Sequence, residues 1–450
     1  MNNNHMTDRQ FWRAVPAWSD VSLQEFASPI WQERNSASRP QELISLVDQI
    51  ADPNLVEDIL EGFRTSSMSV RVPPYILALI DWERPHQDPL RKQYVPLGSE
   101  VEPDHPMMQL DSLNERNDSP VEGLVHRYRD KALFLALGVC PVYCRYCTRS
   151  YAVGMDTEEL KKPKLSARPS RWEPALEYIS GRREIRDIVV SGGDIYRLKS
   201  RQIEYLCNRL LEIPHIRRIR LATKGLAVLP MRIIGDGEWS QTLVEVSRKG
   251  RRLGKEVCLH THFNHPREIT GFTAQAAGFL FENGITVRNQ SVLVRGVNDS
   301  FQTMSLLIDM LSDLQIHPYY VYLCDQVSGT EHLRVPLRTA IDLEKRLRGW
   351  TAGYNTPLWV VDTTGGGGKR DIHSYEKYDP DTGIAVYSSP TVRPGDLFFH
   401  YDPLSSLGSS NSRLWNSPDW REDAIARHRH IPFNRIVTDE TCPKTSAAEW

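Results

Sequence analysis

Three of the seven cysteines in this chain of 450 residues form one short run, Cys140-Pro-Val-Tyr-Cys144-Arg-Tyr-Cys147. A CxxxCxxC spacing brings three thiolates onto one tight loop, whereas structural zinc usually takes four ligands from two separated pairs. Three thiolates can hold three irons of a [4Fe–4S] cluster and leave the fourth iron open to a ligand. The alternative is a structural zinc or an adventitious cluster, completed by a histidine or by Cys207, Cys258 or Cys324. The spacing favours a metal centre with one open position.

A second run with chemical potential is the glycine-rich segment 362–369, DTTGGGGK, which ends in Lys369. It is not a nucleotide-binding P-loop, because its glycine spacing differs and Arg370 follows the lysine where Ser or Thr is required. Four glycines can deliver a lysine into a crowded site, and such a lysine can form a Schiff base with a carbonyl cofactor. The alternative interpretation of this segment is a flexible linker.

These residues belong to a region, from about 130 to 365, in which short apolar runs alternate with longer amphipathic stretches. The pattern predicts strands at 132–137, 187–190, 216–221, 256–260, 286–293, 319–323 and 358–361. It predicts helices at 174–179, 201–211, 241–253, 274–283, 301–314 and 339–347. Apolar strands separated by helices indicate an α/β fold with a parallel sheet, as a partial or full (βα) barrel. A doubly wound open sheet is the competing architecture.

The remaining segments are predicted to surround this barrel. We expect a mostly helical N-terminal extension at 1–120, the barrel at 121–370, a C-terminal extension at 371–405 and a disordered tail at 406–450. Polar residues follow most of the strands, and in a barrel such positions converge on one mouth. These residues are Cys140, Asp194, Thr223, His262, Asp325 and Asp362. The alternative for each is a cap of the next helix.

Composition restricts the function classes. The chain has 55 Lys and Arg against 57 Asp and Glu, so no overall charge attracts nucleic acid or an anionic membrane. No apolar stretch reaches the roughly 20 residues of a membrane helix, and the polar start lacks the apolar segment of a signal peptide. An odd number of cysteines is a poor disulfide framework. We therefore expect a soluble cytoplasmic protein.

The cysteine spacing, with an aromatic residue before the last cysteine, resembles the signature of radical S-adenosylmethionine (SAM) enzymes. The chain further resembles the lysine 2,3-aminomutase family, in HRY at 126–128, THFNHP at 261–266, NQSVLVRGVND at 289–299 and VVDTTGGGGK at 360–369. The resemblance runs from about residue 31 to Lys369. It implies an isomerase that converts L-lysine to L-β-lysine with a [4Fe–4S] cluster, SAM and pyridoxal 5′-phosphate (PLP). It also implies an electron donor of the flavodoxin or ferredoxin type and a homo-oligomer.

The resemblance assigns roles to individual residues. Lys369 would hold PLP and act in catalysis, and Cys140, Cys144 and Cys147 would ligate the cluster. Further cofactor-binding residues would be Arg127, Tyr128, Gln290, Ser191, Gly192, Gly193, Asp194 and His262. Arg149 would bind the substrate carboxylate, and Asp325 and Asp362 would hold its distal cationic group. Two facing carboxylates imply a cationic amino acid, since they would repel a second carboxylate on the substrate.

Several departures from the family pattern keep other interpretations open. Bacterial members commonly have RRRFAG after the cluster cysteines, where this chain has RSYAVG at 149–154. A cysteine that some members use for zinc between subunits is Ser300, so we expect no such zinc. An arginine 2,3-aminomutase is the nearest alternative, because two carboxylates also grip a guanidinium. A non-catalytic metal-binding protein is the alternative from another class.

Overall fold

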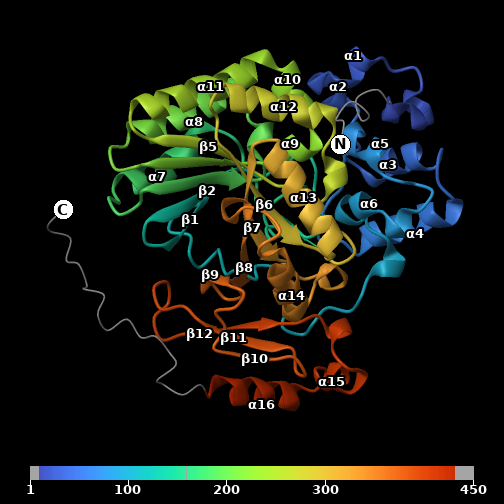
Figure 1. Cartoon of the computed structure of the whole chain (residues 1–450), viewed down its shortest axis with the longest axis vertical. Coiled ribbons are helices and arrows are strands. Elements are labelled where there is room, and N and C mark those ends of the chain that lie inside the picture. The colour runs from blue at the N-terminus through green and yellow to red at the C-terminus, as the bar shows by residue number, and fades with distance from the viewer. Residues whose placement is uncertain (1–9, 159, 431–450) are drawn as a thin grey trace.

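The computed structural model describes residues 10–158 and 160–430 (Figure 1). Its centre is a nine-stranded sheet in which the strands follow the order of the chain, from β1 to β9. The strands are β1 Leu124–Tyr128, β2 Lys131–Leu137, β3 Asp187–Gly192, β4 Arg218–Ala222, β5 Glu256–Thr261, β6 Val287–Leu293, β7 Ile316–Leu323, β8 Leu358–Thr363 and β9 Gly368–Asp371. Strands β2 to β8 are parallel, and β1 and β9 pair antiparallel at the two edges.

Helices connect the parallel strands and cover the outside of the sheet (Figure 1). They are α7 Pro169–Ser180, α8 Ser200–Glu212, α9 Gly225–Val228, α10 Met231–Gly235, α11 Gly237–Arg252, α12 Gly271–Glu282, α13 Phe301–Asp313 and α14 Leu337–Leu347. The predicted α/β barrel is confirmed, and each predicted strand and helix has its counterpart. The sequential strand order rules out a doubly wound sheet, in which the order reverses at a switch point.

Alternation along the strands separates the core from the lumen. In β3, Ile188 and Val190 are fully buried in the main hydrophobic core, where the outer helices pack. Asp187, Val189 and Ser191, on the other face of the same strand, line the central cavity. Side chains alternate across a strand, so a run with an apolar pattern can still present polar residues to a lumen.

The N-terminal extension is helical, as predicted, and packs on the barrel. Its helices are α1 Leu23–Phe26, α2 Pro29–Arg34, α3 Pro40–Val47, α4 Pro53–Arg64, α5 Pro74–Leu79 and α6 Pro89–Tyr94. Proline occupies the first turn of α2 to α6, where its missing N–H costs no helical hydrogen bond. Tyr75 shares a hydrogen bond of 2.8 Å with Thr270. Buried residues of the extension belong to the same core cluster as the barrel.

The C-terminal part differs from the prediction. Strands β10 Lys377–Asp379, β11 Ile384–Ser388 and β12 Leu397–Tyr401 form a second sheet, followed by helices α15 Ser409–Leu414 and α16 Pro418–Arg429. Trp415 and Ala424 are fully buried against this sheet. The predicted disordered tail is therefore wrong for residues 409–429, because Trp415 and Ala424, with the partly buried Trp420 and Ile425, pack an otherwise polar segment against the sheet. The rest of that prediction, 431–450, lies outside the described residues.

No helix within residues 10–158 and 160–430 is both long enough and apolar enough to cross a membrane. The longest of these helices, α11, has 16 residues.

Candidate active site

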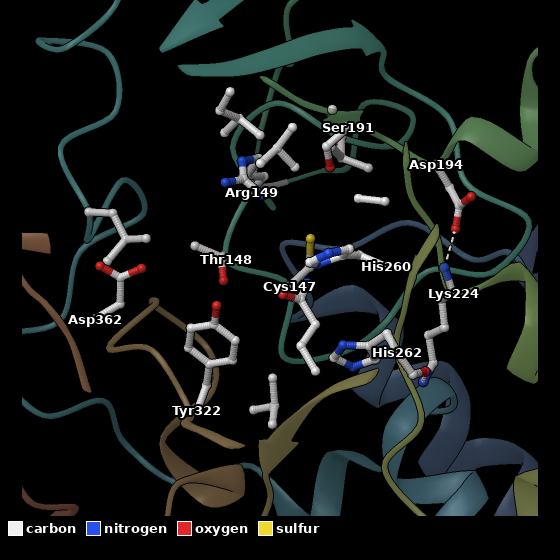
Figure 2. A pocket seen from close by; sticks show the side chains of 18 of the residues that line it. Cys147, Thr148, Arg149, Ser191, Asp194, Lys224, His260, His262, Tyr322 and Asp362 are labelled. Atoms are coloured by element: carbon white, nitrogen blue, oxygen red, sulfur yellow. Dashed lines mark hydrogen bonds between the residues drawn. The ribbon is translucent and has the colours of Figure 1, made fainter. Parts of the chain in front are cut away.

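A cavity of about 400 Å³ lies within the barrel, and Figure 2 shows part of its lining. Residues from all nine strands of the central sheet line it. Every residue that the sequence singled out for a site lines it. These residues are Arg127, Tyr128, Cys140, Cys144, Cys147, Arg149, Ser191, Gly192, Gly193, Asp194, His262, Gln290, Asp325, Asp362 and Lys369. The barrel brings together positions this far apart in the chain because the carboxyl ends of its strands share one mouth.

The three cysteines lie on the loop that follows β2, and all three are free thiols facing the cavity. Burial raises the pKa of Cys140 well above its usual value and that of Cys144 to about 12. A metal centre would have to displace these protons, since thiolates are the metal ligands. Within the described ranges, no three His, Cys, Asp or Glu side chains converge as a ready site for a metal ion. Cys207, Cys258 and Cys324 are buried, as expected of core residues.

The backbone requires glycine at 192 and 193, where β3 ends. Gly192 has a φ of +107°, and a Cβ on Gly192 or Gly193 would overlap the carbonyl oxygens of Leu137 and Val139. Asp194 links two strand ends, because its carboxylate accepts from Thr223 Oγ1 and from the Lys224 backbone N–H, both at 2.6 Å (Figure 2). Both of its oxygens are thus engaged within the protein.

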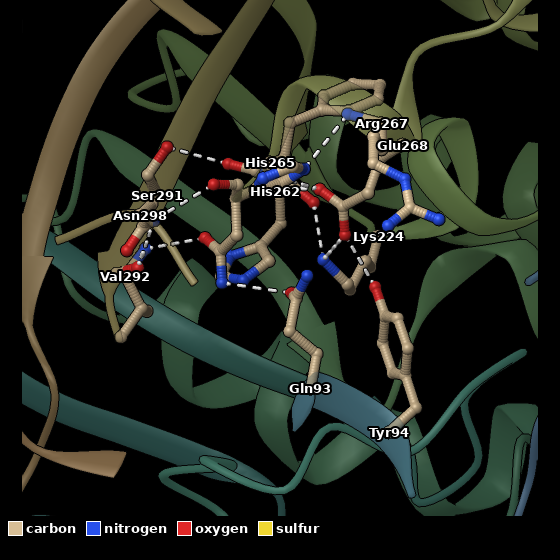
Figure 3. A network of polar contacts seen from close by, with 12 residues as sticks. Gln93, Tyr94, Lys224, His262, His265, Arg267, Glu268, Ser291, Val292 and Asn298 are labelled. Atoms are coloured by element: carbon tan, nitrogen blue, oxygen red, sulfur yellow. Dashed lines mark hydrogen bonds and ion pairs between the residues drawn. The ribbon is translucent and has the colours of Figure 1, made fainter. Parts of the chain in front are cut away.

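Behind this wall lies a polar network that includes the N-terminal extension (Figure 3). Lys224 Nζ lies 3.1 Å from Glu268 Oε1 and donates to the His262 carbonyl oxygen at 2.9 Å. Tyr94 of α6 donates to the same Glu268 oxygen at 2.6 Å. Burial, followed by the charge of Lys224, lowers the pKa of His262 well below its usual value. A neutral His262 ring, 3.0 Å from the Tyr146 hydroxyl, therefore faces the cavity beside the cysteine loop.

The glycine-lysine segment is a hairpin, and the linker interpretation is wrong. Strands β8 and β9 pair antiparallel so that Asp362 lies opposite Lys369, and Gly365 and Gly366, with φ of +86° and +98°, lie in the turn between them. Lys369 Nζ lies 2.9 Å from Asp362 Oδ2, and its backbone N–H donates to the Tyr128 hydroxyl at 2.9 Å. Burial opposes the charge, but Asp362 outweighs it and raises the pKa of Lys369 well above its usual value.

A second carboxylate lies near this pair. Asp325, after β7, accepts a short hydrogen bond from Thr148. Burial, and then the charge of Asp362, raises the pKa of Asp325 to about 7. Among the described residues, one oxygen of each aspartate is buried without a hydrogen-bond partner. Buried acceptors of this kind are costly unless a donor satisfies them, so this end of the cavity offers two oxygens that a hydrogen-bond donor could reach.

Arg127, expected to bind the cofactor, is already paired with another residue of the protein. Its Nε lies 2.7 Å from Asp118 Oδ2, and both side chains are buried. Two other cations face the lumen at its floor, with Lys131 Nζ 4.3 Å from the Tyr128 ring centre and Arg220 Nε 2.7 Å from Asp187 Oδ1. Sequence reasoning missed Lys131 and Arg220 as site residues, although their inward position follows from strand alternation.

Glu115 was also missed, and no sequence signal marks it. It belongs to the turn 111–118, at the end of the N-terminal extension, and this turn lines part of the cavity. Its carboxylate receives the Nε and Nη2 groups of Arg149, at 2.9 and 2.6 Å. Burial disfavours the charged guanidinium, but the charge of Glu115 outweighs it and raises the pKa of Arg149. Arg149 therefore keeps its charge in the cavity wall.

A (βα) barrel with a CxxxCxxC loop at its mouth is the architecture of a radical SAM enzyme, and comparisons with known proteins assign the family. The L-lysine 2,3-aminomutase of Acetoanaerobium sticklandii is 38% identical over 357 residues, or 79% of this chain and 80% of that protein. The L-lysine 2,3-aminomutase of Clostridium subterminale is 36% identical over 362 residues, or 80% and 81%. The glutamate 2,3-aminomutase of Clostridioides difficile is 32% identical over 301 residues, or 67% of each.

The chain therefore belongs to the lysine 2,3-aminomutase family, and it is an aminomutase, an isomerase. No protein-family model matches the chain. Among solved structures, a histidine-tagged anSMEcpe with bound AdoMet has a TM-score of 0.36 and 12% identity, covering 48% of this chain and 56% of that one. A likeness of that size adds nothing to the family assignment, which the sequence relatives carry.

Proposed function

We propose that this protein is an L-lysine 2,3-aminomutase, which moves the α-amino group of L-lysine to the β-carbon and gives L-β-lysine. The observation that carries the proposal is the charge layout of the cavity. Arg149 offers a cation for the substrate carboxylate, and Asp325 and Asp362 offer two buried carboxylates for a distal cation. Glutamate is disfavoured, because its second carboxylate would meet two others in a buried space.

The end of the cavity that contains Asp325 and Asp362, here called the cation end, accommodates a primary ammonium. Lys369 Nζ already lies against Asp362 at 2.9 Å, which has the geometry of an ammonium–carboxylate pair. The side-chain ammonium of L-lysine has the same chemistry and three donors for the buried oxygens that Asp325 and Asp362 keep open within the described part of the chain. This supports lysine ahead of arginine, whose planar guanidinium prefers two coplanar acceptors.

The residues at the mouth fit a [4Fe–4S] cluster with SAM. Cys140, Cys144 and Cys147 would ligate three irons. Gly192 and Gly193 also line the cavity, and because they have no side chains a ligand could approach their backbone closely. When bound, these groups supply the radical that removes hydrogen from the substrate. Lys224, the cation that acts most strongly on the pKa of Cys144, would partly offset the negative charge of such a centre.

The lumen fits PLP. Lys369 supplies the amine, Tyr128 and Tyr322 place rings 5.8 and 5.5 Å from its Nζ, and Lys131 and Arg220 provide charge for a phosphate. When bound, PLP supplies a π-system that lowers the barrier to nitrogen migration. Gln290 lines the same space. Arg127, held by Asp118, would act on the phosphate only through its remaining donors.

The protein's own groups then have defined tasks. Asp362 keeps a proton on Lys369 Nζ while the two are paired. Thr148 and Arg149 are consecutive, and they contact Asp325 and Glu115 respectively, so one dipeptide fixes both charged ends relative to the cysteine loop. Holding reacting groups at fixed separation within an enclosed lumen lowers the entropic cost of reaction and excludes water.

The deciding experiment is anaerobic reconstitution with iron, sulfide, PLP, SAM and a reductant, followed by product analysis with lysine and arginine supplied together. L-β-Lysine is the expected product. β-Arginine alone would overturn the substrate assignment and leave the class of reaction intact. Asp325→Asn should cut kcat/KM for lysine by about a hundredfold or more, since a buried charge partner is lost. Asp342→Asn, an exposed change on α14, is the matched control.

We further infer that the enzyme takes electrons from a flavodoxin or ferredoxin type of donor, forms a homo-oligomer and works in the cytoplasm. The family assignment and the free, buried thiols support a reducing environment. Reduction of the reconstituted cluster by flavodoxin, and the mass of the protein in solution, test the first two inferences.

A further inference from the structure

The guanidinium of Arg149 is held along one edge by a single buried carboxylate. The Glu115 side chain is 4% exposed and the Arg149 side chain 23%, so the acid lies deeper in the wall than the arginine. Two hydrogen bonds engage the edge formed by Nε and Nη2. Both protons of Nη1 and one proton of Nη2 remain for another acceptor. Glu115 therefore determines which edge of Arg149 is available to a ligand.

Glu115 is fixed in turn by its neighbours. The Tyr151 hydroxyl donates to Glu115 Oε2 at 2.9 Å, and Tyr151 is 5% exposed. The backbone N–H groups of Glu115 and Arg116 donate to the two carboxylate oxygens of Asp111, at 2.9 and 3.0 Å. The carboxylate of Glu115 thus receives three side-chain donors and sits on a closed turn. It cannot rotate without breaking charged hydrogen bonds in a buried place.

We propose that Glu115 is a positioning residue that aims the free edge of Arg149 at the substrate carboxylate, and that Tyr151 holds Glu115 in place. This inference rests on the proposed function, in which Arg149 binds that carboxylate. Tyr151 occupies a position where bacterial members of the family commonly carry arginine. Because position 151 is a tyrosine here, no second arginine of the described chain forms an ion pair with Glu115. Arg149 is the charged partner of Glu115.

The consequence of losing Glu115 follows from the other charges of the cavity. Asp325 is near enough to feel the charge of Arg149. A guanidinium released from Glu115 would turn toward Asp325, because an unpaired buried charge is costly. The substrate would then lose its carboxylate partner, and the cation end would lose part of its negative charge.

The test measures equilibrium binding of L-lysine and L-lysinamide to the protein reconstituted with iron, sulfide and PLP. The two ligands differ only at the carboxylate. A charge-assisted pair with Arg149 should give wild type a preference for lysine of about 10- to 100-fold. Glu115→Gln should reduce that preference at least about fivefold, and Tyr151→Phe about two- to threefold, since one supporting hydrogen bond is lost. Glu122→Gln, at an exposed acid that does not line the cavity, should leave this preference unchanged.

The outcomes separate the inference from the proposed function. If Arg149→Met abolishes the preference while Glu115→Gln and Tyr151→Phe both leave it unchanged, the positioning role is wrong and the proposed function stands. If Arg149→Met keeps the preference, the carboxylate role of Arg149 is itself wrong. Should Glu115→Gln fail to fold, Tyr151→Phe decides alone, because it removes only one hydroxyl. A purely structural role would weaken both ligands equally and leave their ratio unchanged.

Discussion

Replacing Asp325 by asparagine should change how the stability of the protein depends on pH. Burial, helped by the negative charge of Asp362, raises the pKa of Asp325 from 3.8 to about 7. We assign the raised pKa to Asp325 because Asp362 is compensated by Lys369 at 2.9 Å. Asparagine keeps the size of the side chain and removes its titration.

The sign and size follow from proton binding. Between about pH 4 and pH 7 the folded protein holds one proton on Asp325 that the unfolded chain has released, so folding stability falls as the pH rises through this window. One pKa unit corresponds to about 1.4 kcal/mol, so wild type should lose about 3 kcal/mol between pH 5 and pH 8 from this group alone. Asp325→Asn should lose none of it.

Urea unfolding of the cofactor-free protein at pH 5, 6, 7 and 8 measures this difference. The stability of Asp325→Asn relative to wild type should rise by about 2–3 kcal/mol from pH 5 to pH 8. Asp342→Asn, an exposed aspartate on α14, should show a constant difference. If the Asp325→Asn difference is as flat as this control, Asp325 does not titrate between pH 5 and pH 8, and the argument that burial and Asp362 raise its pKa to about 7 fails.

Three further predictions concern the walls of the site. Glu268→Gln should lower the free energy of unfolding by about 3–5 kcal/mol, measured by urea titration, because Lys224 stays buried without its partner; a loss under about 1 kcal/mol would contradict this. Gly193→Ala should destabilise by about 2 kcal/mol or more in the same assay, since its Cβ meets backbone, and an unchanged midpoint would refute the packing role. Cys147→Ser should abolish the iron–sulfur absorbance after reconstitution, whereas Cys207→Ser, a core cysteine, should retain it; equal spectra would exclude the cysteine loop as the metal site.

Periodicity and spacing in the sequence were enough to predict the barrel. Apolar runs between amphipathic stretches marked all the parallel strands, because burial on both sides leaves a continuous apolar signature. The antiparallel edge strands β1 and β9 were not predicted. The residues of β1 were interpreted only as part of the HRY motif, and β9 follows glycines that resemble a linker. The folded end of the chain was missed for a related reason. The apolar residues of this segment, such as Trp415 and Ala424, are too widely spaced among polar ones to form a pattern, and their burial depends on a sheet formed elsewhere in the chain.

By itself the sequence determined which residues to propose for the site, namely three cysteines, a lysine after glycines, one arginine and two aspartates, all of which line the cavity. These are chemical types at short spacings, and short spacings are readable along a chain. Only the tertiary structure decided how the charged groups in and behind the cavity wall are paired. It joined Glu115 to Arg149 across 34 positions and Lys224 to Glu268 across 44. Pairing of this kind depends on which strand ends and loops meet in space, and no local pattern encodes that meeting.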